Sequence, residues 1–100
     1  MNAELESLFD LIRSVAYANK YNGFISDKQL IMVNKGLDKS FPERSDRINF
    51  LRKCFKRDNI RSSKDLSKAE ASALISYIYV DNWMISPNWL DMMEVFSKEQ

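Results

Sequence analysis

The sequence contains no histidine and a single cysteine, Cys54, and both scarcities exclude familiar chemistry. Without histidine, the usual zinc sites, a Ser-His-Asp triad and a Cys-His dyad are all ruled out. One cysteine also excludes a disulfide within the chain. We therefore expect a protein that is not an enzyme and uses no cofactor or metal.

Long apolar runs and an excess of one charge are missing as well. No apolar run is longer than four residues, and the N-terminus lacks the basic and apolar regions of a signal peptide. These absences predict a cytoplasmic protein with no membrane partner. The 15 basic and 14 acidic side chains give a net charge of +1, which excludes a histone-like polycation.

Apolar residues are plentiful and follow helical spacing. They make up 45% of the 100 residues, whereas glycine and proline contribute two residues each, which argues against a disordered chain. Apolar positions recur at steps of three and four, the pattern of amphipathic helices. The sequence predicts an all-α single domain, 1–100, built as a small bundle of four to five helices. The expected helices span residues 3–17, 27 to about 36, from between 42 and 46 to about 57, 68–79 and 87–97. Either Gly36 or the polar stretch 38–40 is expected to end the second helix.

Capping signals mark several of the expected helix starts. Ser26 with Gln29, and Ser67 with Glu70, have the spacing of capping boxes. Ser86 precedes Pro87, a pair typical of an N-cap and a first helical residue. We expect the second, third and fourth helices to form a compact centre, with 26–79 as a central module and flanking helices at 1–22 and 82–98.

Charge is unevenly distributed along the chain. Residues 43–64 hold eight bases and three acids, whereas residues 65–100 hold two bases and six acids. A basic helix face on an otherwise neutral protein is the electrostatic pattern of phosphate binding. The sequence thus predicts contacts with nucleic acid, DNA or RNA, or with a nucleic-acid-bound protein. The candidate residues are Arg47, Arg52, Lys53, Lys56, Arg57, Arg61 and Lys64.

The central module resembles a helical module of phage proteins. The shared pattern begins with the capped helix at Ser26 and Gln29, continues with a helix carrying Leu51 and Phe55, and closes with residues 62–67 and 70–75. It is similar to the C-terminal region of phage single-strand-annealing recombination proteins and to GemA-like phage regulators. The connection at residues 37–44 is longer than the short glycine turn of that pattern. The resemblance implies a phage or mobile-element accessory protein that acts near DNA replication or recombination.

Two alternatives remain open at this stage. The basic face is equally explained by pairing with the acidic C-terminal helix, within one molecule or in a homodimer through the terminal helices. The second interpretation is a protein inhibitor or adaptor that docks on a host DNA-processing or defence complex. Aromatic and methionine side chains are enriched at such contacts. Its expected partner-binding residues are Trp83, Met84 and Met92, whereas Trp89 and Met93 are assigned to the core.

Two smaller features allow two interpretations each. Tyr17, Tyr21 and Phe24 are suited either to stacking on unpaired bases or to simple packing at a helix end. Cys54 has Lys53, Lys56 and Arg57 as neighbours, which would lower the pKa of its thiol, although a half-buried, unreactive thiol is the expectation.

Overall fold

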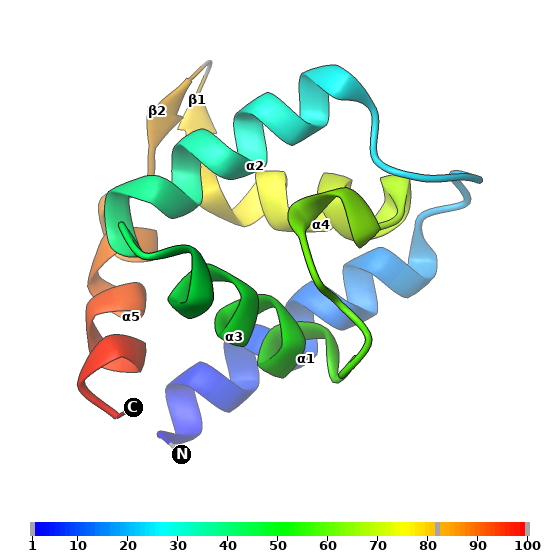
Figure 1. Ribbon diagram of the computed structural model, residues 1–100. Helices are drawn as coiled ribbons and strands as arrows, with labels where there is room; N and C mark the ends of the chain where they lie inside the picture. Colours follow the sequence, from blue (N-terminus) through cyan, green and yellow to red (C-terminus); the bar gives the residue numbers. More distant parts are fainter. Residues whose placement is uncertain (1, 82, 100) are drawn as a thin grey trace.

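The computed structural model describes residues 2–81 and 83–99, and within them the all-α prediction is confirmed (Figure 1). A short antiparallel hairpin is added between the last two helices, with Tyr79 opposite Ile85 and Asp81 opposite Met84. Asn82, in the turn predicted there, lies outside the described residues. The elements are α1 (Ala3–Ala18), α2 (Asp27–Ser40), α3 (Arg44–Phe55), the 3-10 turn η1 (Ser63–Asp65), α4 (Lys68–Ile78), β1 (Tyr79–Asp81), β2 (Met84–Ile85) and α5 (Pro87–Lys98).

Local capping explains where the helices begin. Both predicted capping boxes are present: the hydroxyl of Ser26 accepts from the amide of Gln29, and that of Ser67 accepts from the amide of Glu70. In each box the residue at the third helical position accepts a bond back from the amide of the cap. The hydroxyl of Ser86 caps α5. Each such cap stabilises its helix by about 1 kcal/mol.

The expectation that the second, third and fourth helices form the centre by themselves is wrong. α4 lies against both α1 and α2, and α1 also packs on α3 (Figure 1). The first and last helices carry a large part of the buried apolar surface, because the apolar face of each helix points into the core. From α1 these residues are Leu5, Phe9 and Ile12, and from α5 they are Trp89, Met93 and Phe96.

An aromatic cluster joins α1, α3 and α5. Phe50 lies at its centre, stacked on Phe41 with ring centroids 5.4 Å apart and meeting Phe9, Trp89 and Phe96 edge to face at 5.5–5.7 Å. Edge-to-face and offset arrangements suit the charge distribution of aromatic rings. The cluster fixes α3 by its buried side and leaves the opposite side of that helix to solvent.

Gly36 does not end α2, contrary to one of the two sequence-based expectations for that helix. The helix continues to Ser40, and Gly36 is buried where α2 meets α4. A β-carbon at this position would lie 2.6 Å from Cγ2 of Ile78. The glycine is therefore required by the close approach of two helices rather than by a turn.

Candidate nucleic-acid interface

The structure divides the eight basic residues of segment 43–64 into two groups. Arg47 and Arg57 are half-buried and form ion pairs with acids of other elements. The other six are exposed. We call these six the basic surface: Arg44, Arg52, Lys53, Lys56, Arg61 and Lys64.

Arg47 holds the end of α2 to the start of α3. Its Nη1 lies 2.9 Å from Oδ1 of Asp38 and also donates to the carbonyls of Phe41, at 2.8 Å, and Pro42, at 2.9 Å. One guanidinium group thus satisfies backbone acceptors in the α2–α3 connection. Although the sequence proposes Arg47 as a phosphate ligand, its main contacts are within the protein.

Arg57 has a similar structural role at the other end of α3. Its guanidinium pairs with the carboxylate of Glu70, the residue that completes the capping box of α4, and donates to the carbonyl of Asp65 at 3.1 Å. The side chain of Glu70 is only 14% exposed. Because an acid this sheltered needs a partner, Arg57 is a poor candidate for contacting an external phosphate.

Arg52 and Arg44 tie the α3–α4 connection to α3. Nε of Arg52 donates to the carbonyl of Ile60 at 2.7 Å, and Nη2 of Arg44 donates to the carbonyl of Arg61 at 2.9 Å. A guanidinium carries five N–H donors, so each side chain keeps donors for a ligand. These bonds place the connection beside α3, which brings residues distant in sequence onto one surface.

Lys53 and Lys56 occupy the opposite end of the basic surface. Nζ of Lys53 lies 5.7 Å from the ring centroid of Phe96, and Lys56 ends α3 with a left-handed backbone, φ 52°. Both line a hollow of about 230 Å³ with Arg13, whose guanidinium pairs with Asp10. Glu6 also borders this hollow, so its charges are mixed.

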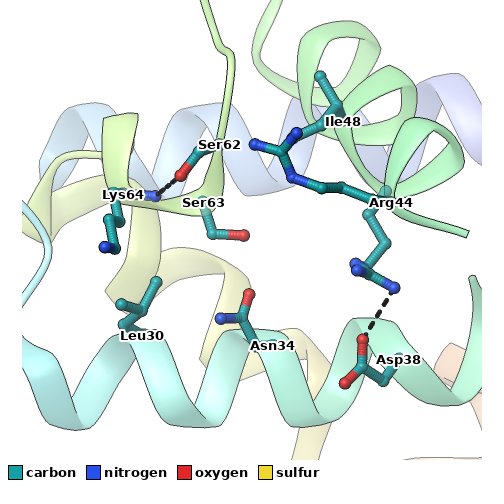
Figure 2. Close-up of a pocket in the computed structure, with 9 residues that line it drawn as sticks. Leu30, Asn34, Asp38, Arg44, Ile48, Ser62, Ser63 and Lys64 are labelled. Atoms are coloured by element: carbon teal, nitrogen blue, oxygen red, sulfur yellow. Dashed lines mark hydrogen bonds and ion pairs between the residues drawn. The ribbon is translucent and has the colours of Figure 1, made fainter. Parts of the chain in front are cut away.

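A second pocket, of about 200 Å³, lies between α2, α3 and η1 (Figure 2). It combines Arg47 and Lys64 with Arg44, which the sequence analysis did not select. Arg44 belongs to the same basic segment, and the charge count of that segment was the available signal for it. The full lining is Leu30, Asn34, Asp38, Arg44, Arg47, Ile48, Ser62, Ser63 and Lys64.

The three residues proposed for partner binding do not lie together. Trp83 and Met84 are on the hairpin, 41% and 61% exposed, and Nζ of Lys35 in α2 lies 4.9 Å from the centroid of the Trp83 ring. Met92 is half-buried and lines an apolar groove between α1, α4 and α5. The assignment of Trp89 to the core is confirmed, with 2% exposure.

The other sequence candidates have clear positions. Tyr17, Tyr21 and Phe24 are all exposed, Tyr17 by 93%, so the packing interpretation does not hold for them. Cys54 is fully buried rather than half-buried. Burial raises the pKa of its thiol, an effect that outweighs the attraction of the Arg13 guanidinium and reverses the shift proposed from its basic neighbours.

The chain matches no protein-family model, no curated protein and no solved structure. No helix within residues 2–81 and 83–99 is long and apolar enough to span a membrane. Over the same residues, no group of three or more acids and cysteines is placed to hold a metal ion. The geometry and charge of the surface therefore carry the functional inference.

Proposed function

We propose that this protein is a non-enzymatic accessory protein that binds nucleic acid, or a nucleoprotein, through its basic surface. The observation that carries the proposal is the division of the basic segment: two arginines form ion pairs with Asp38 and Glu70, while six cations remain exposed along α3 and the α3–α4 connection.

The ion pairs of Arg47 and Arg57 do not involve α5. The acids that pair with the basic segment, Asp38 and Glu70, belong to α2 and α4, and in α5 the carboxylate of Glu94 pairs with Lys98 of the same helix. The basic segment also meets α5, where the ammonium of Lys53 lies over the ring of Phe96. A cationic surface of this kind contacts phosphates, which bind exposed cations without sequence preference.

The resemblance of residues 26–79 to a module of phage recombination and regulatory proteins supports the same proposal. On that resemblance we propose that the chain is a phage or mobile-element protein that acts near DNA in the cytoplasm of a host. We include this origin in the proposal and derive the mode of binding from the cations alone.

The test is fluorescence anisotropy with labelled single- and double-stranded DNA and RNA at several salt concentrations. With about four phosphates contacted, the logarithm of the affinity should fall with the logarithm of salt at a slope of about −3 to −4. The variant to compare is Lys53→Glu with Lys56→Glu and Arg61→Glu. Arg47 and Arg57 are left intact because their loss would disturb folding as well as binding.

A matched control carries the same change in charge elsewhere: Lys20→Glu, Lys39→Glu and Lys98→Glu. We expect the first variant to lose binding by more than about tenfold, the control to lose much less, and both to keep the helical circular dichroism spectrum. Equal losses in the two variants, or no binding by the unmodified protein at low salt, would overturn the proposal.

A second candidate function is supported by the hairpin. Trp83 and Met84 are exposed, together with Val80 and, on neighbouring α2, Ile31. An adaptor that docks on a protein of a host DNA-processing or defence complex would use these apolar side chains. Trp83→Ser with Met84→Ser should then abolish binding to that partner complex and leave the affinity for nucleic acid unchanged.

A further inference from the structure

We propose that the pocket between α2, α3 and η1 binds a terminal phosphate of a nucleic acid, a phosphate monoester at a strand end. The inference rests on the proposed function and deepens it by assigning one ligand group to one site. Its starting point is that α3 contributes two arginines, and η1 with its N-cap residue contributes two hydroxyls and a lysine, to a single concavity that α2 borders (Figure 2).

The size of the pocket suits a phosphate group. Its volume is about 200 Å³, and a water molecule in the liquid takes up about 30 Å³. A phosphate and a few bridging waters therefore fit inside the pocket. The sugar at a strand end would remain outside, along the exposed part of the basic surface.

The charge of the pocket suits a dianion. Asp38 is the single acid in the lining, and it pairs with Arg47. The guanidinium of Arg44 donates to a neutral backbone carbonyl, and the structure shows no carboxylate paired with it or with Lys64 in the described part of the chain. The lining thus keeps a net charge of +2, and a phosphate monoester at neutral pH carries about −1.5 to −2.

Neutral donors surround the same space. The hydroxyl oxygen of Ser62 accepts from the amide of Lys64, which leaves its hydrogen free to donate, and the hydroxyl of Ser63 points toward the middle of the pocket in Figure 2. Arg44 also belongs to the first turn of α3, whose N-cap residue, Glu43, makes no capping bond with its side chain. The positive end of the helix dipole adds to the attraction for an anion.

These donors favour a strand end over an internal phosphate. A terminal phosphate has three free oxygens and one covalent link, whereas an internal phosphodiester has two free oxygens and a chain leaving on both sides. Two cations and two hydroxyls match three free oxygens, and the charge-assisted bonds among them are the stronger kind.

The experiment compares one oligonucleotide in three forms: 5′-phosphorylated, 3′-phosphorylated and with both ends as hydroxyls. Anisotropy titrations with the unmodified protein should show about tenfold tighter binding for one phosphorylated form. Arg44→Gln with Lys64→Gln should remove that preference, so that the three forms bind with equal affinity. Because both residues belong to the basic surface, the affinity for the hydroxyl form should fall as well, and the readout is the ratio of affinities between the forms. Lys64→Gln alone, which removes no side-chain hydrogen bond or ion pair found within the described residues, guards against misfolding of the double variant.

The matched control is Lys20→Gln with Lys98→Gln, which changes the net charge equally and touches no lining residue. It should retain the preference for the phosphorylated end. Equal affinity for all three forms would overturn the assignment of the pocket and leave the proposed function standing. Absence of binding to every form would overturn both, and a shift of the amide resonances of residues 62–64 on adding inorganic phosphate would then assign the pocket to free phosphate.

Discussion

The two connections that flank α4 differ in how they pack: one is anchored in the core, whereas the other exposes apolar side chains. The α3–α4 connection, residues 56–67, buries Ile60 and Leu66 completely and receives hydrogen bonds from arginines of α3. The α4–α5 connection is the hairpin, whose Val80 and Met84 are both about 60% exposed. Its link to α2 includes the hydroxyl of Tyr79, which donates to the carbonyl of Met32 at 2.6 Å.

The difference shows how a connection acquires a function. Apolar anchors and arginine bonds hold the first connection in place, so its exposed cations, Arg61 and Lys64, stand at defined positions beside Arg44. The hairpin presents apolar surface instead, outside the core. The two candidate functions therefore lie on different parts of the molecule, and variants can separate them.

The largest expected effect tests the anchoring of the first connection. Ile60→Ala should lower the free energy of unfolding by about 2–5 kcal/mol, because it removes a fully buried side chain and leaves a cavity. Met84→Ala, in the hairpin, should change it by less than about 0.5 kcal/mol. Urea denaturation followed by circular dichroism measures both, and similar losses for the two variants would refute the contrast.

The next prediction separates structural from surface arginines. Arg57→Met leaves the sheltered carboxylate of Glu70 without its partner and should cost about 1–3 kcal/mol. Arg61→Gln, whose side chain is exposed, should stay within about 0.5 kcal/mol. Pairing Arg57→Met with Glu70→Gln should recover part of the loss in a double-mutant cycle, and full additivity would show that the pair contributes nothing.

Alkaline pH should lower the free energy of unfolding first through Cys54 of α3, and only at higher pH through Tyr79 of the hairpin. Burial raises the pKa of Cys54 above its ordinary value of 9.0, so the native thiol keeps its proton while the unfolded thiol loses it. The free energy of unfolding should therefore be constant below about pH 9 and fall above it by up to about 1.4 kcal/mol per pH unit. Cys54→Ala should remove this slope in pH-dependent urea denaturation.

Tyr79 of the hairpin should also make the free energy of unfolding fall with rising pH, but more weakly than Cys54. Burial raises the pKa of its phenol above 10.0, so its contribution is complete below pH 10 and is lost as the pH rises further. Tyr79→Phe should leave the slope that begins near pH 9 unchanged. If Tyr79→Phe, and not Cys54→Ala, removed that slope, the assignment to Cys54 would be wrong.

The smallest effect concerns the outer contact of the hairpin. Lys35→Gln removes the ammonium from the face of Trp83 and should cost about 0.5–1 kcal/mol. The same substitution in a Trp83→Leu background should cost nearly nothing, because the ring is already gone. An equal cost in both backgrounds, measured by thermal unfolding, would assign the effect of Lys35 to another contact.

Local signals in the sequence were sufficient for the helices and their starts. Capping pairs act over three residues, so the boxes at Ser26 and Ser67 formed as predicted. The hairpin was not predicted, because β1 and β2 span only three and two residues and show no alternation of apolar and polar side chains. Gly36 was one of two proposed ends for α2, since a glycine that permits close helix packing looks identical in sequence to one that ends a helix.

For the candidate site, the sequence determined that residues 43–64 carry the basic charge, because composition is a property of the chain itself. Only the tertiary structure decided which cations are available, because the acids that neutralise Arg47 and Arg57 come from α2 and α4. It alone also placed Arg44 and Lys64 around one pocket. The physical reason is that ion pairing and pocket formation depend on distances between segments far apart along the chain, and no local pattern encodes those distances.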